Sequence, residues 1–233
     1  MERKFAFALD EHYHIYNRGT DRRLIFLDDA DYAHFLKLLY LCNGTKRVEL
    51  RLLPKGKSPF ESNRGETLVD IGCYCLMPNH FHLLLHEKVE GGVSKFMLKL
   101  ITAYVMYFNR KYARSGGLFE DSFKATRAND DRYLEYLFAY IHLNPIKLIE
   151  PRWKEAGISD LTKAREHLST YAYSSYLEFF GHEREQKSIL NRNAFPEYFE
   201  TQKEFADFHD QWLQFGNDFT VDGHESLATE SVE

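Results

Sequence analysis

The 233-residue chain has few cysteines, few prolines and no long apolar run. Its three cysteines, Cys42, Cys73 and Cys75, are an odd number without the spacing of a disulfide framework, so we expect reduced thiols in a cytoplasmic protein. No stretch approaches the roughly 20 apolar residues of a membrane-spanning helix, and the first residues are apolar too briefly for a secretory signal. These absences exclude a disulfide-stapled secreted scaffold and a membrane-spanning protein.

The chain also lacks the excess of positive charge that marks many nucleic-acid binders. Residues 1–60 carry 11 Lys and Arg against 8 Asp and Glu, residues 61–150 carry 11 of each, and residues 151–233 carry 8 against 16. The net charge of −5 therefore comes from the last third. This distribution predicts weak long-range attraction to duplex DNA but allows a local site that binds a few phosphates.

A globular core is present, because 44% of the residues are hydrophobic and 15% are aromatic. Alternating and helical hydrophobic patterns predict its elements in chain order. The expected strands cover residues 5–17, 47–53, two halves of 68–88 broken at Met77-Pro78-Asn79, and 118–127. The expected helices follow an N-cap at Asp28 or Asp29, cover residues 93–108, and run from Asn129 or Asp130 to about residue 144.

Apart from the short strand at 47–53, this order is β-α-β-β-α-β followed by one more helix. It is typical of the α+β class with a ferredoxin-like, split βαβ antiparallel sheet and helices on one face. We expect residues 1–150 to form this domain, residues 151–215 to form a helical C-terminal extension, and residues 216–233 to form a flexible acidic tail.

The first candidate for chemistry is the pair His80 and His82. Side chains alternate along a strand, so both imidazoles lie on one face while Phe81 and Leu83 lie on the other. Two imidazoles at i and i+2 can bind one divalent cation. An H-x-H triplet alone is weak evidence, since an ordinary histidine pair on a half-exposed strand looks the same. A second triplet, residues 12–14, shows how readily the pattern arises.

The second candidate is Tyr140 with Asn144, one helical turn apart on one face. The Asn144 carbonyl oxygen can bind a hard cation, and the Tyr140 phenol can attack phosphorus once it is deprotonated. The alternative is that Tyr140 is a core aromatic and that Asn144 ends the helix before Pro145. Tyr133 and Tyr136 on the same helix are rival nucleophiles.

Taken together, these segments resemble a known family. CYCLMPNHFHLLL and YLEYLFAYIHLNPIK are similar to the HUH transposases that use one catalytic tyrosine, where HUH means His, a hydrophobic residue, His. HYHIYNRGTDRRLIF, GLFEDSFKA and YAYSSYLEFFG fit the same superfamily, and the nearest branch is that of the REP-associated tyrosine transposases. The resemblance covers roughly residues 10–180, and PNHFH and YIHLNP are its most specific parts.

The resemblance implies the site and its cofactor. His80 and His82 match the HUH pair and would bind Mg²⁺ or Mn²⁺. Tyr140 matches the family nucleophile, and Asn144 matches the third metal ligand. That ligand is usually Gln in the insertion-sequence branch, so Asn fits the REP-associated branch better. Residues 1–150 would then be the catalytic domain.

The resemblance also implies the reaction and the partners. The tyrosine would cut single-stranded DNA beside a hairpin, form a 5′-phosphotyrosine and pass the strand to a 3′-OH without ATP. The chain has no G-x-x-x-x-G-K-[ST] phosphate loop, which agrees. We expect Arg18, Arg22 and Arg23 to contact phosphates, although a solvated turn would use the same residues. A homodimer is implied by the insertion-sequence relatives and a monomer is allowed by the REP-associated branch.

Two other function classes remain open on sequence alone. One is a catalytically silent nucleic-acid-binding regulator on the same fold, and the other is a metal-dependent hydrolase in which Tyr140 is structural. The acidic excess after residue 150 leads to a further hypothesis, that this segment repels DNA near the site and restrains activity.

Overall fold

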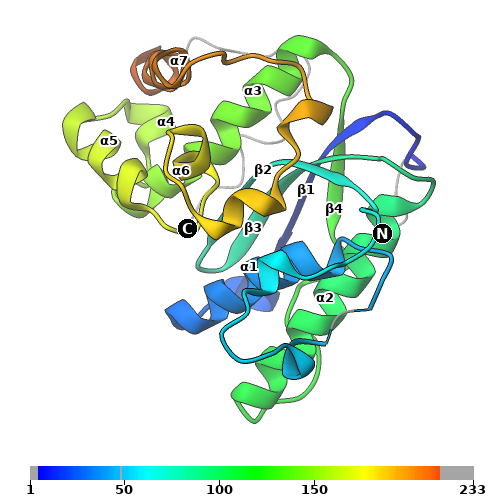
Figure 1. Ribbon diagram of the computed structural model, residues 1–233. Helices are drawn as coiled ribbons and strands as arrows, with labels where there is room; N and C mark the ends of the chain where they lie inside the picture. Colours follow the sequence, from blue (N-terminus) through cyan, green and yellow to red (C-terminus); the bar gives the residue numbers. More distant parts are fainter. Residues whose placement is uncertain (1–4, 48, 216–233) are drawn as a thin grey trace.

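The computed structural model describes residues 5–47 and 49–215, and the predicted acidic tail at 216–233 lies outside this range. Figure 1 shows one sheet between two sets of helices. The strands are β1 (His12–Arg18), β2 (Asp70–Met77), β3 (His80–His86) and β4 (Lys124–Ala128). The helices are α1 (Asp29–Cys42), α2 (Gly92–Lys111), α3 (Asp131–His142), α4 (Trp153–Ala156), α5 (Leu161–Thr170), α6 (Tyr176–Phe179) and α7 (Gln202–Phe215).

The sheet has the ferredoxin-like order β2-β3-β1-β4, and every neighbouring pair is antiparallel. In the register of β1 with β3, Tyr16 lies opposite His82 and Arg18 lies opposite His80. The predicted α+β class and antiparallel split βαβ sheet are therefore confirmed. The register places the end of β1 beside the H-x-H triplet of β3.

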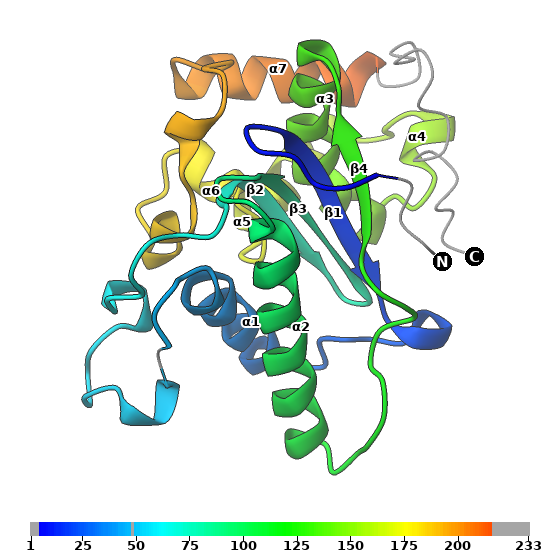
Figure 2. The ribbon, with the colours of Figure 1, turned by 90° about the vertical axis from the view of Figure 1, so that its right-hand side faces the viewer.

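The helices lie on both faces of the sheet, not on one as the ferredoxin-like pattern predicted. Phe81 and Leu83 pack on the face that α1 and α2 cover, whereas Leu84 and Cys75 pack on the face that α3 covers. Figures 1 and 2 show α3 and α7 on the side of the sheet opposite α1 and α2. The physical reason is β2, whose eight residues are all buried, because a strand that is apolar on both faces needs a layer on each.

The helix starts follow from side-chain caps. The Asp28 carboxylate accepts the backbone N–H of Asp31 at the start of α1, and the Asp130 carboxylate accepts that of Tyr133 at the start of α3. These contacts satisfy amide groups that the first helical turn leaves without partners. Both predicted caps are confirmed, and α3 is thereby fixed against the sheet with a defined start.

The strand predicted at 47–53 is wrong. Residue 47 and residues 49–53 form a loop with a 3₁₀ turn at Leu50–Leu52, whose side chains are not buried. The edge of β2 pairs instead with a distant segment, since Leu76 N–H donates to Tyr173 O and Asn191 N–H donates to Ile71 O. Strand pairing of that kind joins residues about a hundred positions apart, which local alternation cannot reveal.

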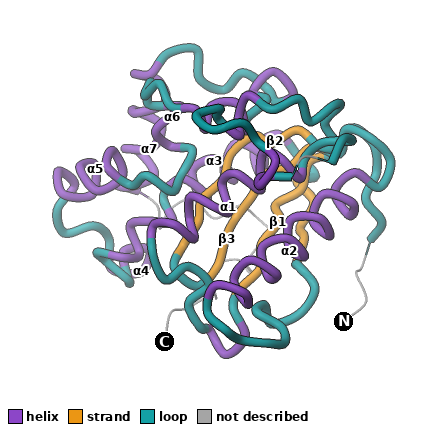
Figure 3. The backbone as a smooth tube through the Cα atoms, turned by 60° about the horizontal axis from the view of Figure 1, so that its bottom comes forward, coloured by secondary structure: helices purple, strands orange, loops and turns teal. Residues whose placement is uncertain are grey.

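The segment after α3 completes the second core. Helices α4 to α7 and the 3₁₀ turns between them pack on α3 through buried aromatic side chains that include Trp153, Phe179 and Phe205. Figure 3 shows α4 and α5 to one side of the sheet and α1 and α2 in front of it. Among the described residues, no helix is both long and apolar enough to cross a bilayer.

Candidate functional site

The tight turn at residues 77–79 delivers His80 and His82 to the face of the sheet that α3 covers. Their ring centroids are 4.9 Å apart, with the rings nearly perpendicular. His82 is 1% exposed, and His80 is half-buried at the start of β3. The alternation predicted from the sequence therefore places both imidazoles side by side, one at the rim and one inside.

Helix α3 brings Tyr140 to the same place within one chain. The Tyr140 ring centroid lies 5.5 Å from that of His82, edge to face, and Tyr140 is 4% exposed. The rival Tyr136 packs against Trp212 of α7 at 5.0 Å, and Tyr133 packs against Tyr136 at 5.9 Å. Among the three tyrosines of α3, Tyr140 is the one with a ring contact to the histidines.

Asn144 follows one turn later, where α3 gives way to the 3₁₀ turn Asn144–Leu148. Its Nδ2 donates to the backbone carbonyl of Tyr140 at 2.8 Å, which fixes the amide plane. In the part of the chain that the structure describes, its buried Oδ1 accepts no hydrogen bond. The amide also lies beside His80, where it partly offsets the lowering of that ring's pKa. A carbonyl oxygen thus remains available next to the histidine pair.

Each histidine of the pair uses Nδ1 for a hydrogen bond. His80 Nδ1 lies 2.6 Å from Asn79 Oδ1, and His82 Nδ1 lies 2.9 Å from Nε2 of His14. His82 Nε2 is buried and has no hydrogen-bond partner among the described residues. A buried ring nitrogen without a partner is costly, and a lone pair at Nε2 is what a metal ligand needs.

His14 was not predicted as a site residue. Its H-x-H triplet was taken only as a sign that such a pattern arises readily. His14 is fully buried, and its ring is stacked 5.0 Å from Tyr16 and lies 5.5 Å from Tyr140. The missed signal was the alternation of β1, which places His14 and Tyr16 on one face just as it places His80 and His82. Only the pairing of β1 with β3 shows that the two faces coincide.

Burial keeps these rings neutral. Desolvation lowers the pKa of His14 to about 3 and that of His80 to about 3, and it lowers the pKa of His82 well below its usual range. Positive charge nearby adds to the effect, from Lys154 at His14 and from Lys147 and Arg18 at His80. Neutral imidazole is the form that binds metal ions.

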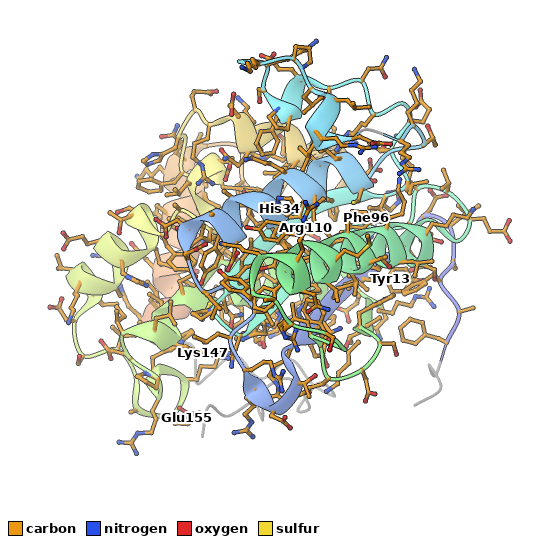
Figure 4. All side chains as sticks on the ribbon, turned by 90° about the horizontal axis from the view of Figure 1, so that it is seen from below. Tyr13, His34, Phe96, Arg110, Lys147 and Glu155 are labelled. Atoms are coloured by element: carbon orange, nitrogen blue, oxygen red, sulfur yellow. The ribbon has the colours of Figure 1, made fainter. Side chains whose placement is uncertain are left out.

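Two lysines lie over the Tyr140 ring, and sequence reasoning missed both. Lys154 Nζ of α4 is 4.2 Å from the ring centroid, and Lys147 Nζ is 5.9 Å away. In Figure 4, Lys147 and the α4 residue Glu155 lie away from the labelled residues of α1 and α2, which are His34, Phe96 and Arg110. Lys147 ends the segment YLEYLFAYIHLNPIK but was given no role there, and Lys154 follows it in a part of the chain where no motif was found.

The three arginines predicted to contact DNA lie at the end of β1 and just after it, beside the turn that precedes His80. Arg18 Nε donates to Glu120 Oε1 at 3.0 Å, and Arg23 donates to Thr20 O at 2.9 Å. Arg22 is exposed and has a left-handed backbone with φ 56°, next to Asp21 at φ 54°. Such backbone costs about 1–3 kcal/mol per residue and is often kept at functional loops. A role for these arginines in DNA binding stays a prediction.

The residues at this site fit a divalent cation, because two of their nitrogen and oxygen atoms are available to bind a metal. Within residues 5–47 and 49–215, His82 Nε2 and Asn144 Oδ1 are buried without hydrogen-bond partners, and His80 lies beside both residues. Over the described chain, no group of three or more His, Cys, Asp or Glu residues is placed to hold a metal. The candidate set is therefore two imidazoles and an amide oxygen, all neutral, and leaves further coordination positions to substrate and water.

Comparison with known proteins identifies the family. The family model described as "Transposase IS200 like" matches residues 10–144, which include all four residues of the candidate site. No curated protein sequence matches the chain. A solved structure described as a REP-associated tyrosine transposase bound to a REP hairpin aligns with 86% of this chain and 91% of its own, at 10% identity and a TM-score of 0.44. On the family match, which spans more than half of its length, this chain belongs to the IS200-like transposase family.

Proposed function

We propose that the protein is a metal-dependent, single-tyrosine DNA strand transferase that cuts single-stranded DNA through a 5′-phosphotyrosine. The observation that carries the proposal is the meeting of Tyr140 with two buried atoms that can bind a metal, His82 Nε2 and Asn144 Oδ1. Neither atom has a hydrogen-bond partner among the described residues. A regulator without chemistry would gain nothing from these costly groups. Transposase family membership agrees with a DNA-processing enzyme.

His80, His82 and Asn144 would hold Mg²⁺ or Mn²⁺. Bound there, the cation would supply polarisation of the scissile phosphate and offset the charge that develops during attack. The three ligands carry no charge, and Lys147 and Lys154 already make the surroundings positive. We therefore expect phosphate oxygens of the DNA to complete the cation site, so that cation and DNA bind better together than apart.

Tyr140 would supply the nucleophile. Its phenolate oxygen attacks the phosphorus, a phosphorus–oxygen bond to Tyr140 forms, and the bond from phosphorus to the 3′ oxygen breaks. The phenol proton leaves to solvent and the freed 3′ oxygen takes up a proton. In the second step another 3′-OH attacks the same phosphorus, and Tyr140 leaves and recovers its proton. One phosphodiester is lost and one is made, so no nucleotide cofactor is needed.

The substrate must be single-stranded at the cut. Tyr140 is 4% exposed under Lys154 and Lys147, so a duplex could not bring its backbone to the phenol. Flexible lysine side chains can swing aside and bind the phosphates that displace them. Arg18, Arg22 and Arg23 lie beside the same turn and would hold neighbouring phosphates of a hairpin or its flank.

A denaturing-gel assay tests the proposal. End-labelled single-stranded hairpin oligonucleotides are incubated with the full chain and Mn²⁺ or Mg²⁺, and a covalent protein–DNA adduct is expected. Tyr140→Phe should abolish the adduct, whereas the matched control Tyr136→Phe should keep it. Cleavage that persists in Tyr140→Phe would instead indicate a water-using hydrolase. DNA binding without any cleavage by the unaltered protein would indicate a silent regulator.

A further inference from the structure

The two histidines of the candidate metal site differ in what holds their Nδ1 atoms. The partner of His80 is the amide oxygen of Asn79, at 2.6 Å. A carbonyl oxygen can only accept, so His80 carries its proton on Nδ1 and presents a lone pair at Nε2. The partner of His82 is Nε2 of His14, at 2.9 Å, and an imidazole nitrogen can either donate or accept.

One proton therefore lies between two neutral rings, and it has two arrangements. If His82 donates from Nδ1, its Nε2 is a lone pair and His14 carries its proton on Nδ1. If His14 donates from Nε2, the proton of His82 is on Nε2, where a cation cannot bind. His14 Nδ1 and His82 Nε2 are both buried and lack hydrogen-bond partners in the described chain. Each arrangement thus leaves one N–H unsatisfied, at a similar cost of about 1–3 kcal/mol.

We propose that His14 is a positioning residue that accepts the Nδ1 proton of His82 and so presents His82 Nε2 to the cation. The inference rests on the proposed function. Without metal the two proton arrangements have similar free energies. Binding of the cation to His82 Nε2 therefore favours the arrangement in which the bridging proton is bonded to His82 Nδ1. Groups behind metal-binding histidines commonly act in this way, and their loss weakens metal binding about 10–100-fold.

The packing around His14 supports a fixed role. Its ring is held between Tyr16, at 5.0 Å and nearly parallel, and Tyr140, at 5.5 Å and edge-on. The Tyr140 edge also contacts His82 at the same centroid distance. His14 is fully buried and packed on both sides, which favours a single ring orientation, and it contacts both the candidate metal ligand and the candidate nucleophile.

Direct measurement of Mn²⁺ binding to the full chain by EPR tests this without any reaction. His14→Phe fills the same space without an acceptor and should raise the Mn²⁺ dissociation constant about 10–100-fold. His14→Gln, which can accept through its amide oxygen, should recover most of the loss. His12→Phe is the matched control, because His12 lies on the same strand and face but contacts Ala194 O and His86 instead. It should bind Mn²⁺ as the unaltered protein does.

Nitrogen-15 NMR of the histidine rings with Mg²⁺ gives a second readout on the unaltered protein, whether or not the variants fold. Saturating Mg²⁺ should move the His14 proton to Nδ1 and the His82 proton to Nδ1. Ring nitrogens that stay unchanged at saturation overturn the inference, as does a His14→Phe protein that binds Mn²⁺ normally. If either result occurs while His80→Ala still abolishes Mn²⁺ binding, the role of His14 is refuted but the proposed function is retained. An unaltered protein that binds neither ion overturns the inference and the proposed metal site together.

Discussion

Replacing Lys154 by methionine removes a positive charge from the Tyr140 ring while keeping a flexible apolar stem of similar length. Lys154 Nζ lies 4.2 Å from the ring centroid, and its charge also reaches His14 and His82. A cation at this distance favours phenolate over phenol. We therefore expect Lys154→Met to make the nucleophile harder to form, so that adduct formation needs a higher pH.

The size of the effect follows from the geometry. The ammonium of Lys154 lies 4.2 Å from the centre of the Tyr140 ring, and Lys154 is half-exposed. With an effective dielectric constant of about 40–80, the attraction is roughly 1–2 kcal/mol. The cation also attracts the neutral ring by about 0.5–1 kcal/mol, which offsets part of this difference. The remaining difference of about 0.5–1 kcal/mol corresponds to a shift of the pH profile by about half a unit toward alkaline pH.

Single-turnover adduct formation with saturating hairpin DNA and Mg²⁺ measures the profile. Lys154→Arg keeps the charge and should restore the unaltered midpoint. Lys124→Met is the matched control, since Lys124 Nζ lies 5.8 Å from the ring of Tyr16 rather than from that of Tyr140. This variant removes one positive charge from β4 and leaves the surroundings of the Tyr140 ring unchanged. Equal shifts in Lys154→Met and Lys124→Met, or no shift in either, would refute the reasoning.

Three further predictions concern stability, each measured by urea denaturation. Arg184→Met should cost roughly 3–5 kcal/mol of unfolding free energy, because it strands the carboxylate of Glu178, whose side chain is 1% exposed and 2.6 Å from the guanidinium. Gly72→Ala should cost about 1–3 kcal/mol, because a Cβ would lie 2.7 Å from the Phe195 ring. Burial lowers the pKa of His209 to about 4, so the unfolded chain binds a proton first as the pH falls below about 6.5. Stability should therefore drop between about pH 6.5 and 4, and His209→Phe should make that drop smaller.

Local patterns were sufficient for the sheet and its helices because alternation, helical spacing and acidic caps act within a few residues. The β2 run also held an unused signal. A strand that is apolar on both faces, with Tyr74 on one and Cys75 on the other, already indicates a layer on each side. The strand predicted at 47–53 failed for the opposite reason. Its alternation was real, but the edge of β2 was taken by residues after 170, which no local pattern contains.

The candidate site shows the same difference between local patterns and long-range pairing. Spacing on a single element was enough to find each pair of candidate residues, His80 with His82 and Tyr140 with Asn144. The resemblance to the family then indicated that both pairs belong to one site. His14 could not be read, because its partner lies 68 residues away and only the register of β1 with β3 brings them together. Residues close in sequence thus supplied the candidate metal ligands and the candidate nucleophile. Long-range strand pairing supplied the residue that we propose positions them.

The segment after residue 150 shows why a summed charge is a poor guide to a local field. Its acidic excess led to the hypothesis that it repels DNA, yet it places Lys154 over the candidate nucleophile. Part of the excess is neutralised within the segment, where Glu178 pairs with Arg184 and Asp210 pairs with Arg165. Electrostatic interactions weaken with distance and are screened by salt. A phosphate at the site is therefore attracted by the nearby lysine more strongly than it is repelled by distant carboxylates.

Truncation cannot test whether this segment restrains DNA binding, because its buried aromatic side chains form much of the core against α3. Neutralising its exposed carboxylates keeps that core and changes only the distant field, so an unchanged affinity for DNA in such a variant would show that the local lysines govern binding.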